Sequence, residues 1–306
     1  MEPRGLFVGL TTIDIQYLVD TFPALNSKTV AGTFAMSVGG PATNAAVAFA
    51  NAGGKCHLIS AIGNNQFTPF IESELHHYNV EFTDLSPLAR QLPTVSSIVT
   101  TRGGHRTVIT TASSITANTS DTTSVAHPDD YDVVLVDGFN METCCMVAAQ
   151  AKQCAKPVVL DGGSWKDGME RLLPSIDIAI CSEHFLSPDG GDEDSVMKYL
   201  ARQGVRYRAI TRGERSIIYS VPDGNGEIEI GPQEVVDTLG AGDILHGAFC
   251  YYYAVGNNFV PALLHASRIA TLSCQTVGTR SWMKRQYASG DVMMITDLKM
   301  GCSLYF

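Results

Sequence analysis

The sequence predicts an α/β protein, a three-layer α/β/α sandwich built around a mostly parallel central sheet. Short β-rich runs alternate with helical patterns along the chain, and this alternation is typical of parallel sheets covered by helices. Several runs are nearly all apolar, as expected for strands buried on both faces. The 306 residues are 45% hydrophobic and 17% charged, which is enough apolar material for a large core. Ligands of such sheets bind at the carboxyl ends of the strands.

The expected elements follow one another in a regular order. Strands are expected at 6–10, 56–62, 132–137, 157–161, 177–181, 208–211 and 216–221. Helices are expected at 41–52, 68–77, 141–155, 192–203, 243–255 and 260–277. Gly53-Gly54 follows the first helix, where glycine commonly ends a helix. The chain contains no internal repeat or linker, so we expect a single domain over 1–306.

Two segments, 15–37 and 94–111, break this order. Both alternate between apolar and polar residues and are rich in Thr, Val and Ser, which favours antiparallel strands beside the main domain. Arg102-Gly103-Gly104-His105 in the second segment indicates a hairpin turn. Together the two segments predict a small β-sheet that covers a site as a lid.

Charge and composition exclude several classes of protein. A net charge of -10 argues against a nucleic-acid partner. The eight cysteines include no CxxC pair, and no Cys/His spacing suits zinc. The amino-terminal residues lack the apolar region of a signal peptide, and no apolar run approaches the ~18 residues of a membrane span. We therefore expect a cytoplasmic protein with no membrane partner.

The stretch VVDTLGAGD (235–243) places a glycine-rich turn at the start of an expected helix. The amides of Gly240, Ala241, Gly242 and Asp243 would point outward and add to the positive end of the helix dipole, which suits an anion. Asp243 beside such a site could accept a proton from an attacking hydroxyl. The alternative, a turn with Asp243 as an ordinary helix cap, is common for an isolated motif.

A second glycine motif, SVGGPATNAAVAFANAGG, occupies 37–54. Gly39-Gly40 before Pro41 would allow a ligand to approach the backbone closely. Asn44, one turn into the helix, carries both a donor and an acceptor. The alternative is an alanine-rich core helix that begins with glycine.

These two motifs, in this order, resemble the two signatures of the PfkB (ribokinase-like) family of carbohydrate and nucleoside kinases. GGPATNAAVAFANAGG is similar to the amino-terminal signature, and DTLGAGDILHGA is similar to the carboxy-terminal one, including Gly247-Ala248. The resemblance covers essentially the whole chain. Asp14, the segment 211–214 and Gly278 all fall where the family has counterparts.

The resemblance implies an ATP-dependent phosphotransferase acting on a hydroxyl group, with the primary hydroxyl of a small sugar or sugar derivative favoured. It implies that Asp243 is the general base and that the GAGD turn (residues 240–243) is the anion hole for the transferred phosphoryl group. The acceptor hydroxyls would be bound by Asp14, Gly39, Gly40 and Asn44. Arg106, on the expected lid, could reach an anionic acceptor, or it could simply face solvent.

The resemblance also implies ATP and Mg²⁺, and it allows a monovalent cation such as K⁺ near Asp237. ATP contacts would come from Thr211, Arg212, Gly213, Thr238, Gly240, Gly242, Ser273 and Gly278. Residues 263–281 would flank the adenine. In relatives the lid can also form a homodimer interface.

One departure concerns the metal. Many relatives carry Asn-x-x-Glu after the strand equivalent to 177–181, whereas CSEHF stands here, with Ser182 and Phe185 at the two positions. In DGGSWK, Asp161 and Lys166 are only partial matches to the sugar-kinase pattern Asp-x-Asn-x-Arg. The metal ligand therefore remains open between Asp161 and Glu183.

Two alternatives to a sugar kinase remain. A nucleoside (adenosine-like) kinase would need an aromatic platform for the base, for which Tyr17, Phe34 and Phe139 are candidates. A non-catalytic pseudokinase would use the fold as a binding module. The altered CSEHF segment favours this reading, and the intact DTLGAGD motif argues against it.

Overall fold

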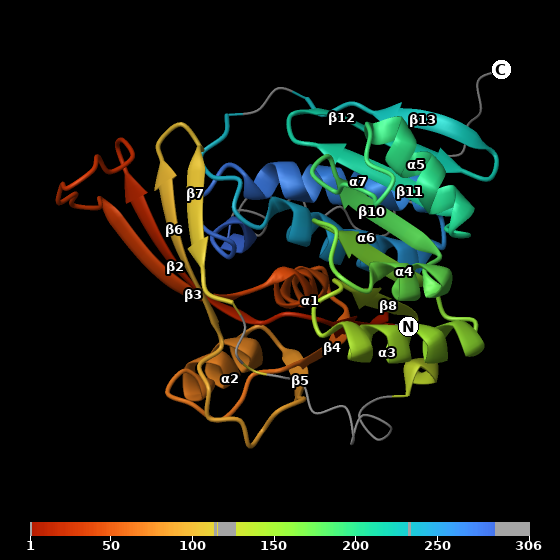
Figure 1. The fold of residues 1–306 in the computed structure, drawn as a ribbon, viewed down its shortest axis with the longest axis horizontal. Helices are drawn as coiled ribbons and strands as arrows, with labels where there is room; N and C mark the ends of the chain where they lie inside the picture. Colours follow the sequence, from red (N-terminus) through yellow and green to blue (C-terminus); the bar gives the residue numbers. More distant parts are fainter. Residues whose placement is uncertain (1, 113–114, 116–126, 232–233, 285–306) are drawn as a thin grey trace.

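The computed structural model describes residues 2–112, 115, 127–231 and 234–284, and it is organised around one large sheet (Figure 1). The strand order is β13 (Gly224–Ile228), β12 (Arg215–Val221), β11 (Tyr207–Arg212), β10 (Ile178–Ser182), β9 (Val158–Gly162), β8 (Val133–Val136), β1 (Arg4–Val8), β4 (Lys55–Ser60) and β5 (Val80–Asp84). Every pairing from β11 to β5 is parallel, and β12 and β13 are antiparallel additions. The mostly parallel central sheet is therefore confirmed.

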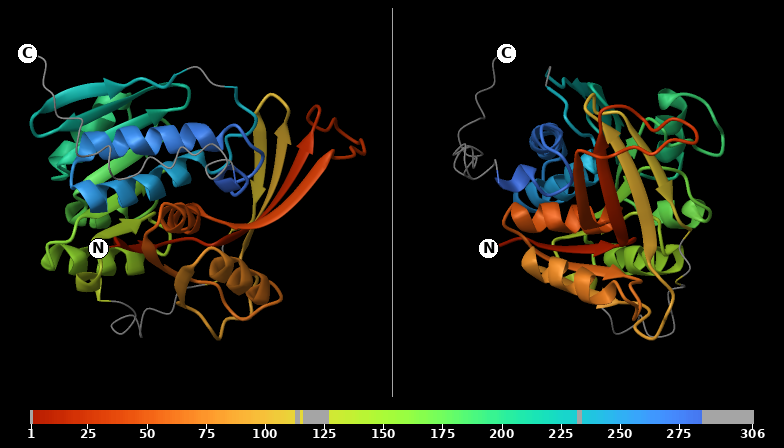
Figure 2. Two further views of the ribbon diagram at one scale, coloured as in Figure 1. Left: turned by 180° about the vertical axis from the view of Figure 1, so that it is seen from behind. Right: turned by 90° about the vertical axis from the view of Figure 1, so that its left-hand side faces the viewer.

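Helices cover both faces of this sheet, which confirms the three-layer arrangement (Figure 2). One face carries α1 (Pro41–Asn51), α2 (Thr68–His77), α6 (Ala241–Gly256) and α7 (Phe259–Ser273). The other carries α3 (Met141–Gln153), α4 (Met169–Leu172) and α5 (Glu193–Arg202). Side chains of β1 alternate between the layers, with Phe7 packing in the first core and Leu6 and Val8 in the second.

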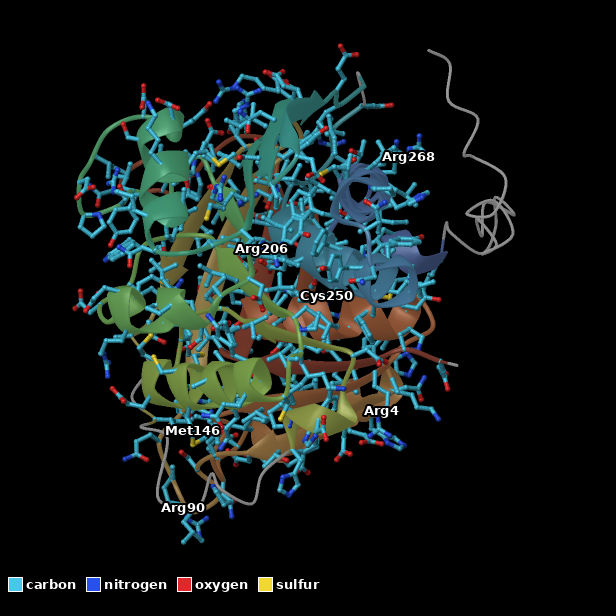
Figure 3. All side chains as sticks on the ribbon, turned by 90° about the vertical axis from the view of Figure 1, so that its right-hand side faces the viewer. Arg4, Arg90, Met146, Arg206, Cys250 and Arg268 are labelled. Atoms are coloured by element: carbon cyan, nitrogen blue, oxygen red, sulfur yellow. The ribbon has the colours of Figure 1, made fainter. Side chains whose placement is uncertain are left out.

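Apolar side chains fill the interior, and most charged side chains lie at the surface; Asp14, Asp161 and Asp237 are buried exceptions. Figure 3 shows Cys250 of α6 inside the molecule, while Arg90 and Arg268 lie at its outside. None of the described helices is long and apolar enough to cross a membrane.

A second sheet projects from one end of the molecule, in the order β3 (Thr33–Gly39), β2 (Thr12–Val19), β6 (Thr94–Thr101) and β7 (Arg106–Thr110) (Figure 1). The expected hairpin joins β6 to β7, with Gly104 at φ 77°. The expectation of antiparallel strands is wrong for one pair, because β2 and β6 are parallel. The chain passes through α1, β4, α2 and β5 before it reaches β6, and such a crossover joins parallel strands.

Two strands were not predicted, and some helix ends differ. β13 has the sequence GNGEI, and β5 is VEFTD; both lie at sheet edges, where long apolar runs are not required. α6 begins at Ala241 rather than 243, and α7 ends at Ser273 rather than 277. The expected single domain includes 285–306, which lie outside the described residues.

The two motif helices, α1 and α6, pack directly against each other. A Cβ added at Gly247 would lie 2.1 Å from the carbonyl oxygen of Ala45 and 2.8 Å from Cβ of Ala48. Only glycine allows the two backbones to approach this closely. This contact brings the amino-terminal ends of both helices to the same place.

Candidate active site

The two glycine turns meet at the amino-terminal ends of α1 and α6. Gly40 precedes α1 with φ 100°, and Gly240 precedes α6 with φ 68°, a backbone region that favours glycine. Asn44 Nδ2 donates a hydrogen bond of 2.7 Å to Asp243 Oδ2. The structure thus joins two side chains that belong to different sequence motifs.

Asp243 lies half-buried in the first turn of α6. Burial raises the pKa of its carboxyl group to about 7, and the negative charge of Asp161 adds to this effect. The hydrogen bond from Asn44 and the nearby His246 act in the opposite direction, while Asp14 raises the pKa further. Such a carboxylate can take up or release a proton near neutral pH.

The GAGD turn offers backbone donors beside this carboxylate. The amide of Ala241 donates to the carbonyl of Thr238 at 3.3 Å, so it is partly used within the turn. The amides of Gly240, Gly242 and Asp243 have no hydrogen-bond partner in the part of the chain that the structure describes. Three of the four expected donors are therefore available to an anion at the helix amino terminus.

Asp14 lies on the lid strand β2 next to the first glycine motif. Its side chain is buried, and Thr12 Oγ1 donates to Asp14 Oδ1 at 2.7 Å. Burial is the main cause that raises the pKa of Asp14. A Cβ at Gly39 would lie 2.0 Å from Asp14 Oδ2, so the glycine leaves room for this carboxylate. Asp14, Gly39, Gly40 and Asn44 are thus neighbours.

Asp237, at the start of the second motif, holds three segments together. Its Oδ1 accepts from the amide of Leu239 at 3.0 Å. Its Oδ2 accepts from Gln16 Nε2 at 2.5 Å and from the amide of Gly278 at 2.8 Å. This buried carboxylate therefore fixes Gly278 beside the motif and connects both to the lid.

Arg106 reaches the same region from the lid strand β7. Its Nη1 donates to Thr238 Oγ1, and the side chain is otherwise exposed. Arg106 therefore contacts the turn that leads into α6, instead of projecting freely into solvent.

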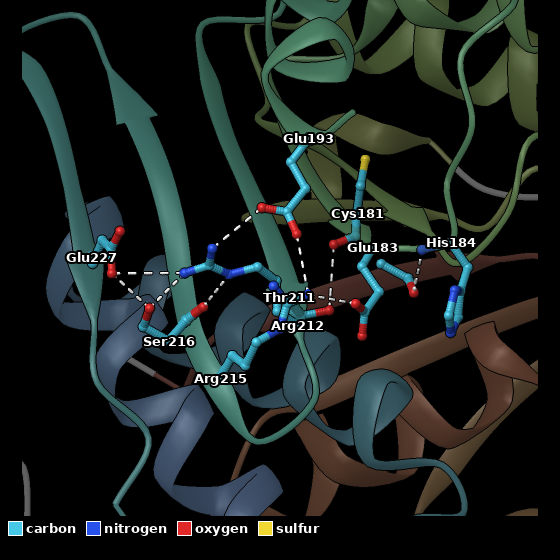
Figure 4. Close-up of polar contacts among 10 residues, drawn as sticks. Cys181, Glu183, His184, Glu193, Thr211, Arg212, Arg215, Ser216 and Glu227 are labelled. Atoms are coloured by element: carbon cyan, nitrogen blue, oxygen red, sulfur yellow. Dashed lines mark hydrogen bonds and ion pairs between the residues drawn. The ribbon is translucent and has the colours of Figure 1, made fainter. Parts of the chain in front are cut away.

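Arg212 lies elsewhere, in a cluster of charged side chains at the end of β11 (Figure 4). Its Nη1 is 3.2 Å from Glu193 Oε2, its Nη2 is 3.6 Å from Glu227 Oε2, and its Nε donates to the carbonyl of Ser216 at 2.6 Å. Within the described residues, no contact joins Arg212 to the GAGD turn. The guanidinium is paired with acidic side chains, so it is not presented to a phosphate in this conformation.

The remaining predicted ATP contacts are distributed around α7 and the end of β11. Gly213 forms the β11–β12 turn with φ 64°, and Thr211 Oγ1 donates to the carbonyl of Cys181 at 3.3 Å. The hydroxyl of Ser273 is used within its own helix, where it donates to the carbonyl of Ala270 at 2.7 Å. A cavity of about 340 Å³ lies between 229–231 and one side of α7.

The two metal candidates differ in their surroundings. Glu183 Oε2 is 2.6 Å from Arg215 Nη2, so this carboxylate is already paired. Asp161 is buried, and its Oδ2 lies 3.3 Å from His246 Nδ1 without a hydrogen bond. No group of three or more His, Cys, Asp or Glu side chains that could hold a metal occurs among the described residues. Mg²⁺ is commonly bound by one or two carboxylates with substrate phosphates, and Asp161 fits that role better than Glu183.

Sequence reasoning did not predict the contacts of Arg280. It lies within 263–281, the segment expected to flank the adenine, but its side chain points to the first glycine motif. Its Nη1 donates to Asn44 Oδ1 at 2.9 Å, and its Nη2 donates to the carbonyl of Val38 at 2.6 Å. Sequence offers little signal for this contact, because a single arginine after a helix has no local pattern.

Comparisons with known proteins show which family this chain is similar to. The family model described as pfkB family carbohydrate kinase matches residues 4–285. Ribokinase from Bacillus subtilis (strain 168) is 24% identical over 285 residues, which covers 90% of this chain and 94% of the relative.

Solved structures show the same fold. Adenosine kinase from Sinorhizobium meliloti matches with a TM-score of 0.78 at 17% identity, covering 94% of this chain and 100% of that one. Arabidopsis thaliana ribokinase, complexed with ribose and ATP, matches with a TM-score of 0.70 at 19% identity, covering 93% and 98%. With a family model that spans nearly the whole chain and a fold of the same type, this protein belongs to the pfkB family of carbohydrate kinases.

Proposed function

We propose that this protein transfers the γ-phosphoryl group of ATP to a hydroxyl, favouring the primary hydroxyl, of a small sugar or sugar derivative. The main support is the pairing of Asn44 with Asp243 at 2.7 Å, next to the unbonded amides of Gly240 and Gly242. A carboxylate and an anion site in contact are the two groups that phosphoryl transfer to an alcohol requires.

Asp243 acts as the general base in this proposal. It accepts the proton of the acceptor hydroxyl while that oxygen attacks the phosphoryl group in line. The amides of Gly240, Gly242 and Asp243 stabilise the negative charge on the equatorial oxygens. The positive end of the α6 dipole adds to this effect.

The acceptor is proposed to lie between the lid and the amino terminus of α1. Asp14 and Asn44 can bind sugar hydroxyls with their side chains, and Gly39-Gly40 allows a close approach to the backbone. The contact between Arg106 and Thr238 supports a lid that lies close to the proposed phosphoryl site. Water excluded beneath the lid would favour transfer to the sugar over hydrolysis of ATP.

The nucleotide is proposed to extend from the GAGD turn along α7. The cavity beside 229–231 has an apolar and polar lining from α7 that suits the adenine. Thr238 lies between 229–231 and the turn along the chain, and the neighbouring Asp237 accepts from the amide of Gly278, which follows α7. Arg212 would have to leave Glu193 to bind a phosphate, so its role depends on a rearrangement.

Two ions complete the proposal. Mg²⁺ would supply positive charge to the phosphates, with Asp161 as the carboxylate that can hold it. For a monovalent cation near Asp237, backbone carbonyl groups are the suitable ligands, because both carboxylate oxygens of Asp237 already accept hydrogen bonds.

A nucleoside is the second candidate acceptor. The fold matches that of an adenosine kinase, and the rings of Tyr17 and Phe34 lie 5.6 Å apart on the lid, where an aromatic pair could stack on a base. Phe139 is less suitable, because Lys166 Nζ already covers its ring at 4.5 Å.

The test is ADP release from Mg-ATP with a panel of ketoses, aldoses, sugar acids and nucleosides. Strong turnover with one sugar supports the proposal and names the acceptor class. Turnover with nucleosides alone overturns it in favour of the second candidate. ATP binding without turnover on any acceptor contradicts the proposal and favours a pseudokinase.

A further inference from the structure

One guanidinium group connects the base of the lid with the partner of Asp243. Arg280 lies just after α7, and only 12% of its side chain is exposed. Its Nη2 donates to the carbonyl of Val38 at 2.6 Å, and its Nη1 donates to Asn44 Oδ1 at 2.9 Å. Val38 belongs to lid strand β3, and Asn44 belongs to α1.

Arg280 and Glu74 together bind both backbone polar groups of Val38. Glu74 Oε2 accepts from the amide of Val38 at 2.9 Å, while Arg280 binds the carbonyl. Arg280 Nε lies 3.3 Å from Glu74 Oε1, so the two side chains form an ion pair. The pair therefore fixes β3 at the residue that precedes Gly39-Gly40.

The contact with Asn44 also determines how that amide is turned. A guanidinium can only donate hydrogen bonds, so it requires the oxygen of Asn44. The NH₂ group must then face the other way, where it donates to Asp243 Oδ2 at 2.7 Å. With the amide reversed, the oxygen would meet the carboxylate and the NH₂ group would meet the guanidinium, and both contacts would be unfavourable.

The guanidinium of Arg280 already has several partners, so it is not free to bind the acceptor. Thr279 Oγ1 accepts from Nη1 at 2.9 Å, and the ring of Tyr78 lies 5.3 Å from the guanidinium carbon. Burial lowers the pKa of Arg280, and the charge of Glu74 opposes this shift. A buried cation with these partners holds the groups around it in place. Removing it would leave the charge of Glu74 uncompensated.

We propose that Arg280 is a positioning residue for phosphoryl transfer, which fixes the base of the lid at Val38 and turns the amide of Asn44 so that it donates to Asp243. The proposal rests on the proposed function. It goes beyond that function by assigning a role to a residue outside both glycine motifs.

The first test compares Arg280→Met and Arg280→Lys with the wild type in steady-state kinetics, using Mg-ATP and the acceptor found in the panel. Arg280→Met should lower kcat on the order of 10²-fold with much less change in the KM for ATP, because a small misplacement of reacting groups is costly. Arg280→Lys should recover part of this loss, because lysine still donates but lacks the fork geometry. Arg208→Met, which removes an arginine bound to Val205, Arg206 and Ser220, is the control and should leave kcat unchanged.

The pH profile separates positioning from general destabilisation. Loss of the Asn44 hydrogen bond should move the acid limb of kcat to higher pH in Arg280→Met, because that bond lowers the pKa of Asp243. The other charged groups that face Asp243 are Asp161, His246 and Asp14; the charge of Arg280 lowers the pKa of Asp14, and Asp161 and His246 keep their own partners in the variant. A variant that is only less stable would lose activity without this shift.

A measurement without turnover completes the test. Hydrogen–deuterium exchange of a peptide covering 36–44 should be faster in Arg280→Met than in the wild type, and unchanged in Arg208→Met. If Arg280→Met does not fold, Arg280→Lys replaces it, with a smaller rise in exchange and a smaller fall in kcat. A folded Arg280 variant with wild-type kcat, acid limb and exchange overturns this inference alone, whereas a wild type that turns over no acceptor overturns the proposed function.

Discussion

At the scale of single residues, the site depends on a carboxylate whose environment sets its protonation. Burial and the charges of Asp161 and Asp14 raise the pKa of Asp243. The hydrogen bond from Asn44 and the charge of His246 lower it. A general base works best when its pKa lies near the working pH. The arrangement around Asp243 therefore matches the role that we propose for it.

We predict that kcat/KM falls as the pH is lowered through about 7, where Asp243 becomes protonated. Because the pKa of Asp243 is raised, its carboxylate becomes protonated, and can no longer act as a base, at a higher pH than an ordinary aspartate. Asn44→Ala should move this acid limb upward, because the hydrogen bond that lowers the pKa is removed. A pH–rate profile that is flat from pH 5 to 8 would exclude Asp243 as the titrating base.

Sequence reasoning named residues that stand in a glycine motif or at a place with a family counterpart, and it did not name Arg280 or Glu74. Asn44 and Asp243 could be named because each stands at a fixed place in a glycine motif. Their hydrogen bond confirms only that they are close, and their catalytic roles stay predictions. Arg280 and Glu74 could not be found, since their contacts join segments that are distant in sequence. The direction of the Arg212 side chain likewise depends on three-dimensional packing against Glu193.

At the scale of elements, the packing of α1 on α6 determines where the two glycine turns meet. Gly247 allows this contact, because a Cβ there would lie 2.1 Å from the carbonyl oxygen of Ala45. That atom belongs to the backbone of α1 and cannot move aside without shifting the helix. The separation of the helices is thus set by a glycine one turn beyond Asp243.

We predict that Gly247→Ala lowers the free energy of unfolding by about 1–3 kcal/mol, the usual cost of overpacking a core. Gly256→Ala, near the end of the same helix, is the matched control, because a Cβ there meets nothing within 4 Å. Urea unfolding of both variants provides the measurement. Equal stabilities of the two variants would show that the helices can separate without cost.

The elements buried on both faces were the ones that the sequence predicted well. Strands β1, β8 and β10 are short apolar runs, and their pattern is clear because helices cover both sides. Edge strands β5 and β13 have no such requirement, so composition alone did not reveal them. The parallel pairing of β2 with β6 depends on the path of the chain between them, which local alternation does not encode.

At the scale of the whole molecule, the lid is connected to the main domain at several points. Gln16 of β2 donates to Asp237, Arg106 of β7 donates to Thr238, and a β-bridge joins Gly104 to Asp237. All of these contacts reach the segment that leads into the GAGD turn. The position of the lid is therefore coupled to the proposed phosphoryl site.

We predict that the lid also forms a homodimer interface. Large apolar side chains are exposed on it, with Phe34 60% and Ile109 72% exposed, and such patches commonly mark interaction surfaces. Light scattering after size exclusion should give a dimer for the wild type and a monomer for Phe34→Ser/Ile109→Ser. Leu88→Ser, which removes an exposed leucine outside the lid, is the control and should stay dimeric. A monomeric wild type at micromolar concentration would refute the interface.

The central claim is that Asp243 is the base for phosphoryl transfer, and Asp243→Asn tests it most directly. The amide keeps the shape of the side chain and cannot take up the proton. We predict that the variant folds and binds ATP like the wild type, while kcat with the preferred acceptor falls by roughly 10²–10⁴-fold. A variant that keeps near-wild-type kcat would contradict the account, because some other group would then have to accept the proton.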